Sequence, residues 1–193
     1  MRSLTNVVLR GKMEKPLWRR LSSTYLIESE HLRIRSDTVE LPSGVVLPNY
    51  YVRESFGFVM VFALTPQREV LLVRQYRYGI NEVIVELPAG SIDRGEEPLA
   101  CARRELLEET GYTAARWEPL VTVPAEPVRS NSYLHAFLAY DAAKTHEQEL
   151  DATEAIEPYT VALPAIRPML RENAFGALSC VAVAYAALDR LGA

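Results

Sequence analysis

Residues 90–112 constrain this chain more than any other segment, because their sequence, GSIDRGEEPLACARRELLEETGY, carries the signals that begin and end a helix. Pro98 suits the first position of a helix, where its missing N–H is no loss. Gly111 suits the position just past the end. A stripe between them is apolar and would pack on a sheet: Leu99, Ala102 and Leu106. We therefore predict a helix over 98–110, preceded by a loop at 87–90.

The same helix carries a row of carboxylates. Glu105, Glu108 and Glu109 stand at i, i+3 and i+4, so they share one face. Arg104 lies one turn before Glu108 and can brace it, and Glu96 adds a carboxylate just before the helix. Like charges this close repel one another, and carboxylate oxygens are the ligands that Mg²⁺ and Mn²⁺ prefer. The row therefore predicts a metal site, whereas a solvated helix face is the alternative for any single glutamate.

The spacing of these residues resembles the Nudix box. Each fixed position of that motif is filled by a matching residue: Gly90, Glu96, Arg104, Glu105, Leu106, Glu108, Glu109, Gly111 and Tyr112. A match of this length is far more specific than a lone glycine fingerprint. The resemblance implies a hydrolase that cleaves a nucleoside diphosphate linked to another group, with Mg²⁺ or Mn²⁺ as the metal. It also implies the α/β class, as a Nudix-type α/β/α sandwich with a mixed sheet and a small N-terminal β subdomain.

Pieces outside the box resemble the ADP-ribose pyrophosphatase branch of this family. They are Trp18 with Tyr25, and residues 41–44, 72–77, 86–90, 135–139 and 154–157. This branch hydrolyses nucleoside diphosphate sugars, chiefly ADP-ribose to AMP and ribose 5-phosphate. Its members are typically homodimers, in which N-terminal strands help to build the partner's nucleotide site. The resemblance thus implies both this substrate class and a homodimer.

The resemblance also implies roles for individual residues. Catalysis falls to Glu108, Glu109 and Arg104. Metal binding falls to the side chains of Glu96, Glu105, Glu108, Glu109 and Glu154, and to the backbone carbonyl of Ala89. Arg77 would hold the substrate's phosphate, since a guanidinium fork fits two phosphoryl oxygens, whereas a strand-end arginine in solvent is the alternative.

Further residues would bind the nucleoside and sugar. Arg53 would be a second phosphate or ribose contact. Glu86 would hold a ribose hydroxyl or support another site residue, unless it is a plain strand-end glutamate. Trp18 and Tyr25 would stack on the base, because an aromatic ring suits a purine face, or else pack across a dimer interface.

One position departs from the branch. Where the branch usually has a glutamate that orients or deprotonates the attacking water, this chain has Ser132. A neutral serine is a poor base near pH 7. The base must therefore come from elsewhere, and the candidates are Glu108, Glu126, Glu154 and Glu157. The departure leaves open another substrate, such as GDP-mannose, a dinucleoside polyphosphate or an oxidised nucleotide.

Composition narrows the class of protein. The 193 residues are 49% hydrophobic, which is enough for one domain with an N-terminal extension. The net charge of −4 and the pI near 5.5 argue against a nucleic-acid partner. No apolar run reaches the length of a membrane span, and two cysteines imply no disulfide framework, so we expect a cytoplasmic protein. The alternative of another class is a non-catalytic nucleotide-sugar sensor, but such domains generally lose the box glutamates.

The sequence also predicts how the chain is organised. Residues 1–54 should form a basic arm and a β-hairpin subdomain for dimerisation and base binding, and residues 55–193 the hydrolase domain. The apolar stretch of the arm is too short for a secretory signal. Strands are predicted at 31–41, 50–52, 56–64, 70–76, 83–87, 120–123, 133–140 and 155–163, and two further helices at 164–171 and 177–191.

Overall fold

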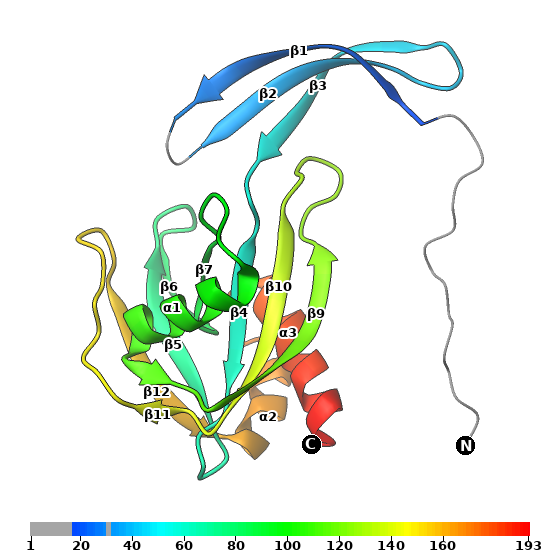
Figure 1. The fold of residues 1–193 in the computed structure, drawn as a ribbon. Helices are drawn as coiled ribbons and strands as arrows, with labels where there is room; N and C mark the ends of the chain where they lie inside the picture. The colour runs from blue at the N-terminus through cyan, green and yellow to red at the C-terminus, as the bar shows by residue number, and fades with distance from the viewer. Residues whose placement is uncertain (1–16, 30–31) are drawn as a thin grey trace, which may run out of the picture. The chain divides into compact units, whose positions relative to one another are not determined.

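The computed structural model describes residues 17–29 and 32–193 (Figure 1). Contacts divide the chain between Glu54 and Ser55 into two compact units. Most of the predicted basic arm, residues 1–16, lies outside the described residues. In the part of the chain that is described, no helix is both long and apolar enough to cross a membrane.

The N-terminal unit contains a three-stranded antiparallel sheet in the order β1-β2-β3. Its strands are β1 (Arg19–Glu28), β2 (Arg33–Glu40) and β3 (Val46–Glu54). β2 and β3 contain the predicted hairpin, but the sequence does not predict β1. The reason is that all ten residues of β1 are exposed, so no alternation of apolar and polar residues marks it as a strand.

A mixed four-stranded sheet forms the centre of the second unit, in the order β7-β4-β10-β9. Its strands are β4 (Phe58–Ala63), β7 (Ala89–Ser91), β9 (Arg116–Pro124) and β10 (Tyr133–Tyr140). β4 and β10 run parallel, whereas β7 and β9 pair antiparallel with their neighbours. The predicted loop at 87–90 is wrong in its second half, because β7 pairs with β4 there.

Two smaller sheets complete the strands of this unit. An antiparallel sheet has the order β12-β5-β6, with β5 (Glu69–Arg77), β6 (Glu82–Glu86) and β12 (Ile156–Ala162). The short strands β8 (Tyr112–Thr113) and β11 (Ala143–Lys144) pair with each other. The sequence does not predict these last two, because a strand of two residues is too short to show periodicity.

The helices lie close to their predicted bounds. α1 (Pro98–Thr110) is followed by Gly111 in the left-handed conformation, with φ of 73°, and the Gly111 N–H donates to the Leu107 carbonyl. A short 3₁₀ turn, η1 (Leu163–Ala165), leads into α2 (Ile166–Arg171), and the chain ends with α3 (Leu178–Leu191).

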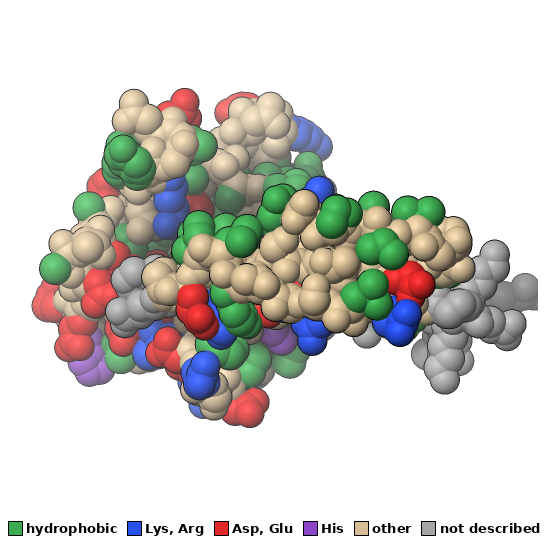
Figure 2. Space-filling model, turned by 90° about the horizontal axis from the view of Figure 1, so that it is seen from above, with side chains coloured by type: hydrophobic (Ala, Val, Ile, Leu, Met, Phe, Trp, Pro, Cys, Tyr) green, Lys and Arg blue, Asp and Glu red, His purple; other side chains and the backbone are tan. Residues whose placement is uncertain are grey.

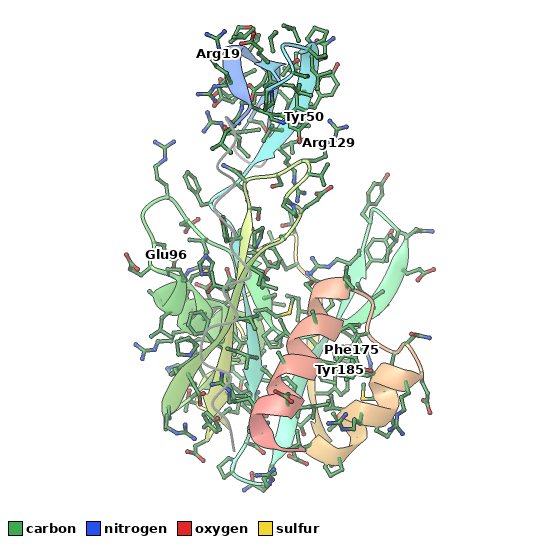
Figure 3. All side chains as sticks on the ribbon, turned by 90° about the vertical axis from the view of Figure 1, so that its right-hand side faces the viewer. Arg19, Tyr50, Glu96, Arg129, Phe175 and Tyr185 are labelled. Atoms are coloured by element: carbon green, nitrogen blue, oxygen red, sulfur yellow. The ribbon has the colours of Figure 1, made fainter. Side chains whose placement is uncertain are left out.

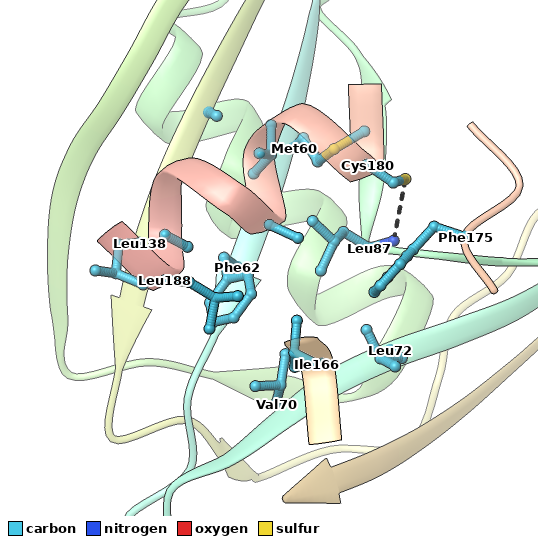
Figure 4. Close-up of a cluster of buried hydrophobic side chains, with 14 of the residues drawn as sticks. Met60, Phe62, Val70, Leu72, Leu87, Leu138, Ile166, Phe175, Cys180 and Leu188 are labelled. Atoms are coloured by element: carbon cyan, nitrogen blue, oxygen red, sulfur yellow. Dashed lines mark hydrogen bonds between the residues drawn. The ribbon is translucent and has the colours of Figure 1, made fainter. Parts of the chain in front are cut away.

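Helices cover both faces of the mixed sheet, and Figure 3 shows α1 and α3 on opposite sides of the strands. Alternate residues of β4 face the two layers. Met60 and Phe62 belong to the core cluster on the side of α3, part of which Figure 4 shows, and Val59 and Val61 to the cluster on the side of α1. The predicted α/β/α sandwich with a mixed sheet is confirmed.

Candidate active site

The buried face of α1 fixes the helix on the sheet and thereby sets the position of its glutamates. Ala102 and Leu106 are fully buried in the core cluster on this side of the sheet. Glu105 and Glu108, on an adjoining face, are only partly buried, whereas Glu109 is 4% exposed. The carboxylates therefore stand on a helix that cannot rotate without breaking the core.

Arg104 is the centre of the charge network on α1. Its Nε and Nη2 donate to the two carboxylate oxygens of Glu96, each at 3.0 Å. Its Nη1 donates to Glu105 and to Glu108, each at 2.9 Å. The hydrogen bonds to Arg104 hold the pKa of Glu96 at about 2, and those to Glu96 raise the pKa of the guanidinium. The predicted contact with Glu108 is present, and two further carboxylates share the same arginine.

Two of the box glutamates, Glu105 and Glu109, are partly or almost fully removed from water. Burial, together with the charges of Glu105 and Glu154, raises the pKa of Glu109 to about 8. Burial also raises the pKa of Glu105. The Ala89 N–H donates to Glu109 Oε2 at 3.0 Å, but this one neutral donor does not offset the loss of water.

Gly90 allows the segment before α1 to approach the acidic face closely. A Cβ atom added at this position would lie 1.9 Å from Cδ of Glu105 and 2.0 Å from its Oε1. The absence of a side chain at Gly90 therefore brings the backbone of Ala89 and Gly90 directly against the carboxylates. This explains physically why the sequence has a glycine at the first position of the box.

A segment distant in sequence packs against the C-terminal part of α1. Gln148 Nε2 donates to the Glu109 carbonyl at 2.5 Å, and the Glu149 N–H donates to the Glu108 carbonyl at 3.0 Å. Farther along this segment, the exposed Glu154 is close enough for its charge to raise the pKa values of Glu105 and Glu109. The sequence does not predict the contact of Gln148, because nothing local signals a contact between residues 39 positions apart.

Arg77 and Glu86 form an ion pair beside the box. Arg77 Nε and Nη2 donate to Glu86 Oε2 at 2.8 and 2.7 Å. Glu86 is buried, whereas the side chain of Arg77 is 43% exposed. Burial raises the pKa of Glu109 and the charge of Arg77 offsets part of this rise, so the pair lies within electrostatic reach of the acidic face. Two roles are predicted for Glu86, and this geometry agrees with the second, in which Glu86 supports another site residue, here Arg77.

Ser132 is buried and bonded through its backbone. It is 3% exposed, its N–H donates to Ser130 Oγ at 3.1 Å, and its carbonyl accepts from the Ala125 N–H at 3.0 Å. Among the other candidates for the base, Glu157 is exposed and pairs with Arg74 at 3.3 Å. Glu126 is also exposed, in the loop that leads to Ser132.

Three residues predicted to contact the nucleotide lie in the N-terminal unit: Trp18, Tyr25 and Arg53. Trp18 is half exposed and packs edge-on against Tyr50, with ring centroids 5.6 Å apart. Tyr25 donates its hydroxyl hydrogen to Glu54 at 2.8 Å. Arg53 lies on β3 with its side chain exposed. Each is accessible within its own unit.

The chemistry of the donor set fits a hard divalent cation. Glu96, Glu105 and Glu108 share one arginine, and burial raises the pKa values of Glu105 and Glu109, so a bound cation would favour the charged form of both. Across residues 17–29 and 32–193, no three or more His, Cys, Asp or Glu side chains are arranged as a complete metal centre. Arg104 lies against three of the carboxylates, so a cation would compete with it for their oxygens.

The raised pKa of Glu109 predicts how the stability of the metal-free protein depends on pH. Between its ordinary value of 4.5 and about 8, folded Glu109 keeps a proton that the unfolded chain has lost. Unfolding then releases this proton, so the free energy of unfolding falls as pH rises, by about 1.4 kcal/mol per pH unit at most. Thermal unfolding in EDTA should therefore show a lower Tm at pH 8 than at pH 6. Glu109→Gln should flatten this dependence, and an unchanged slope in that variant would contradict the assignment.

Comparisons with known proteins agree with the geometry. The model of the NUDIX domain matches residues 57–177, and that of the nucleoside diphosphate sugar hydrolase N-terminal domain matches residues 18–52. An ADP-ribose pyrophosphatase of Bacillus subtilis (strain 168) is 34% identical over 151 residues, which cover 77% of this chain and 81% of that protein. A methanol dehydrogenase activator of Bacillus methanolicus is 31% identical over 160 residues, which cover 82% and 86%.

A solved structure shares the fold. It is the crystal structure of an ADP compounds hydrolase, with a TM-score of 0.81 and 21% identity, covering 93% of this chain and 97% of that chain. Because the NUDIX domain match spans more than half of the sequence and includes the acidic face of α1, the chain belongs to the Nudix hydrolase family.

Proposed function

We propose that this protein hydrolyses the diphosphate linkage of a nucleoside diphosphate sugar, with ADP-ribose as the leading substrate and AMP and ribose 5-phosphate as products. The observation that carries the proposal is the pair Glu105 and Glu109 on α1, whose pKa values are raised by burial and which lie against the backbone of Ala89 and Gly90. The 34% identity to a protein named ADP-ribose pyrophosphatase supports this substrate over other nucleotides.

Mg²⁺ or Mn²⁺ is the proposed cofactor. The groups that would hold it are the side chains of Glu96, Glu105, Glu108, Glu109 and Glu154, and the backbone carbonyl of Ala89. When bound, such an ion supplies Lewis acidity, which neutralises phosphoryl oxygens and makes an attacking water more acidic. No covalent intermediate is proposed, because attack by water on phosphorus needs mainly positioning and charge.

The chain's own residues position the substrate and orient the carboxylates. Glu86 fixes the guanidinium of Arg77, whose exposed edge can bind two phosphoryl oxygens. Arg104 holds Glu96, Glu105 and Glu108 in place. Ser132 is buried, whereas Glu108 lies on the acidic face of α1 and Glu154 is close enough to raise the pKa values of Glu105 and Glu109, so these two are the preferred candidates for accepting the proton of the attacking water.

Ser132→Ala should change kcat by less than about twofold, because the buried hydroxyl is a poor base and the two contacts of this residue are made by its backbone. Steady-state kinetics with ADP-ribose and Mg²⁺ would measure this. A loss of more than about tenfold would show that the serine hydroxyl takes a direct part in the reaction.

The N-terminal unit is the proposed site of homodimerisation and base binding. Figure 2 shows apolar side chains exposed along its sheet. The exposed apolar residues of this unit include Leu21, Leu26, Ile27 and Val46. Several apolar side chains exposed on one sheet favour a protein partner. We propose that this partner is a second copy of the chain. Trp18, Tyr25 and Arg53 would then contribute to the nucleotide site. Light scattering coupled to gel filtration tests the dimer, and a raised KM in Trp18→Ala tests the base contact.

A substrate panel tests the function. The purified protein would be incubated with ADP-ribose, GDP-mannose, a dinucleoside polyphosphate and an oxidised nucleotide, each with Mg²⁺, with Mn²⁺ and with EDTA, and the products separated by chromatography. We expect AMP from ADP-ribose with either metal and none with EDTA. If GDP-mannose is hydrolysed faster than ADP-ribose, GDP-mannose becomes the proposed substrate. Calorimetric binding of ADP-ribose without any AMP formed would indicate a sensor instead.

The cytoplasm is the proposed compartment. Cys101 and Cys180 are free thiols and both are buried, which suits a reducing environment. Detection of the protein by cell fractionation would test this, and recovery mainly outside the cytoplasmic fraction would contradict it.

A further inference from the structure

The first residues of α3, and the segment just before them, cover the free edge of β6. Only β5 pairs with β6 inside its sheet, so every second backbone group of β6 faces away from that partner. Residues two apart on a strand direct their backbone groups to the same edge, and for Val85 and Leu87 this is the edge away from β5. Both are buried or partly buried, and both need a hydrogen-bond partner.

Gly176 supplies the first partner. Its N–H donates to the Val85 carbonyl at 3.0 Å, and Phe175 beside it forms a parallel bridge with Val85. A Cβ atom at Gly176 would lie 2.3 Å from Cβ of Ile84, an atom that a rotamer change cannot move away. The close approach therefore depends on glycine.

Cys180 supplies the second partner. Its sulfur accepts a hydrogen bond from the Leu87 N–H at 3.5 Å, which Figure 4 shows as a dashed line. Cys180 is fully buried, and burial raises the pKa of its thiol to about 12, so it is a neutral acceptor and no nucleophile. The contact joins residues 93 positions apart in the chain.

The segment held in this way carries groups that the site needs. Between the two tethered residues lies Glu86, which fixes Arg77, and two residues after Leu87 comes Ala89, whose N–H reaches Glu109. The Pro88 carbonyl accepts from the Val61 N–H at 2.9 Å, so tethers occur along the whole of 85–89. Loss of one tether would let the segment shift relative to α1.

We infer that Cys180, at the start of α3, is a positioning residue for the reaction, acting through the Leu87 N–H on the segment that carries Glu86 and Ala89. Gly176 has the same role at Val85. This inference rests on the proposed function for its kinetic part. Its structural part is that the Cys180 sulfur holds the segment 85–89 in place, and this part does not depend on whether the protein hydrolyses a substrate.

Two complementary substitutions separate hydrogen bonding from packing. Cys180→Ser keeps an acceptor but is smaller, whereas Cys180→Val fills the space but cannot accept. Val183→Ala is the matched control, because Val183 is fully buried one turn farther along α3 and its side chain cannot form a hydrogen bond. If Cys180→Val does not fold, Cys180→Ala takes its place.

The primary measurement is amide hydrogen exchange of the intact protein, without substrate or metal, followed in the segment 85–90. In Cys180→Val we expect exchange at Leu87 to accelerate about fivefold to tenfold, whereas Cys180→Ser and Val183→Ala should keep it within about twofold of the wild type. In the same variant kcat for ADP-ribose should fall about tenfold with KM nearly unchanged, because a displaced segment harms the reacting geometry more than it harms binding.

The outcomes distinguish the two proposals. If Cys180→Val and Val183→Ala show the same exchange and the same kcat, or if Cys180→Ser is as impaired as Cys180→Val, Cys180 contributes only packing and the inference is wrong. A wild type that hydrolyses no substrate on the panel removes the proposed function but not the exchange result, which alone then decides whether Cys180 holds the segment.

Discussion

Glu109→Gln is expected to lower kcat for ADP-ribose by about a hundredfold or more with saturating Mg²⁺, in the range seen when one charge-stabilising group is removed from an active site. Glutamine keeps the size of the side chain and an oxygen that can still accept from the Ala89 N–H. The substitution therefore removes the ability of the side chain to carry a negative charge, with little other change.

Steady-state kinetics over a range of Mg²⁺ concentrations measures this loss, and circular dichroism checks the fold. Glu97→Gln is the matched control, since Glu97 lies in the same motif segment but is exposed at the start of α1 and should leave kcat within about twofold. Turnover close to the wild type in Glu109→Gln would show that the buried carboxylate is not part of the machinery, and the proposed metal site would have to be moved elsewhere.

Local signals account for what the sequence predicts well. α1 was predictable because Pro98 and Gly111 mark its ends and an apolar stripe marks its buried face. The shared face of Glu105, Glu108 and Glu109 follows from helix geometry alone. Even the brace by Arg104 was visible in part, because its contact with Glu108 spans a single helical turn.

Non-local packing accounts for what the sequence could not predict. β1 is exposed along its length, so no burial pattern marks it, and β7 is a strand only because β4 lies beside it. The contacts of Gln148 with Glu109 and of Cys180 with Leu87 join distant segments, and each residue type is unremarkable at its position. The resemblance suggested that Arg77 binds phosphate, but only the structure shows that Glu86 orients it.

Arg77→Ala should lower kcat/KM for ADP-ribose by about a hundredfold or more, because two charge-assisted hydrogen bonds to the diphosphate would be lost together. The loss has a second cause. Glu86 is buried, and without Arg77 its carboxylate loses its ion-pair partner, which disturbs the end of β6 near the site. Arg77→Lys keeps the charge but not the fork, so we expect an intermediate loss of about tenfold.

Arg74→Ala is the matched control for this prediction. Arg74 lies on the same strand, β5, but its guanidinium pairs with the exposed Glu157 and stacks on the ring of Tyr159 at 4.2 Å. Removing Arg74 eliminates a cation–π contact and a surface ion pair, but no proposed phosphate contact. We therefore expect kcat/KM to stay within about threefold of the wild type. Equal losses in Arg74→Ala and Arg77→Ala would mean that the positive charge of β5 acts at long range. A near-normal kcat/KM in Arg77→Ala would leave the Arg77–Glu86 pair as a structural ion pair with no part in phosphate binding.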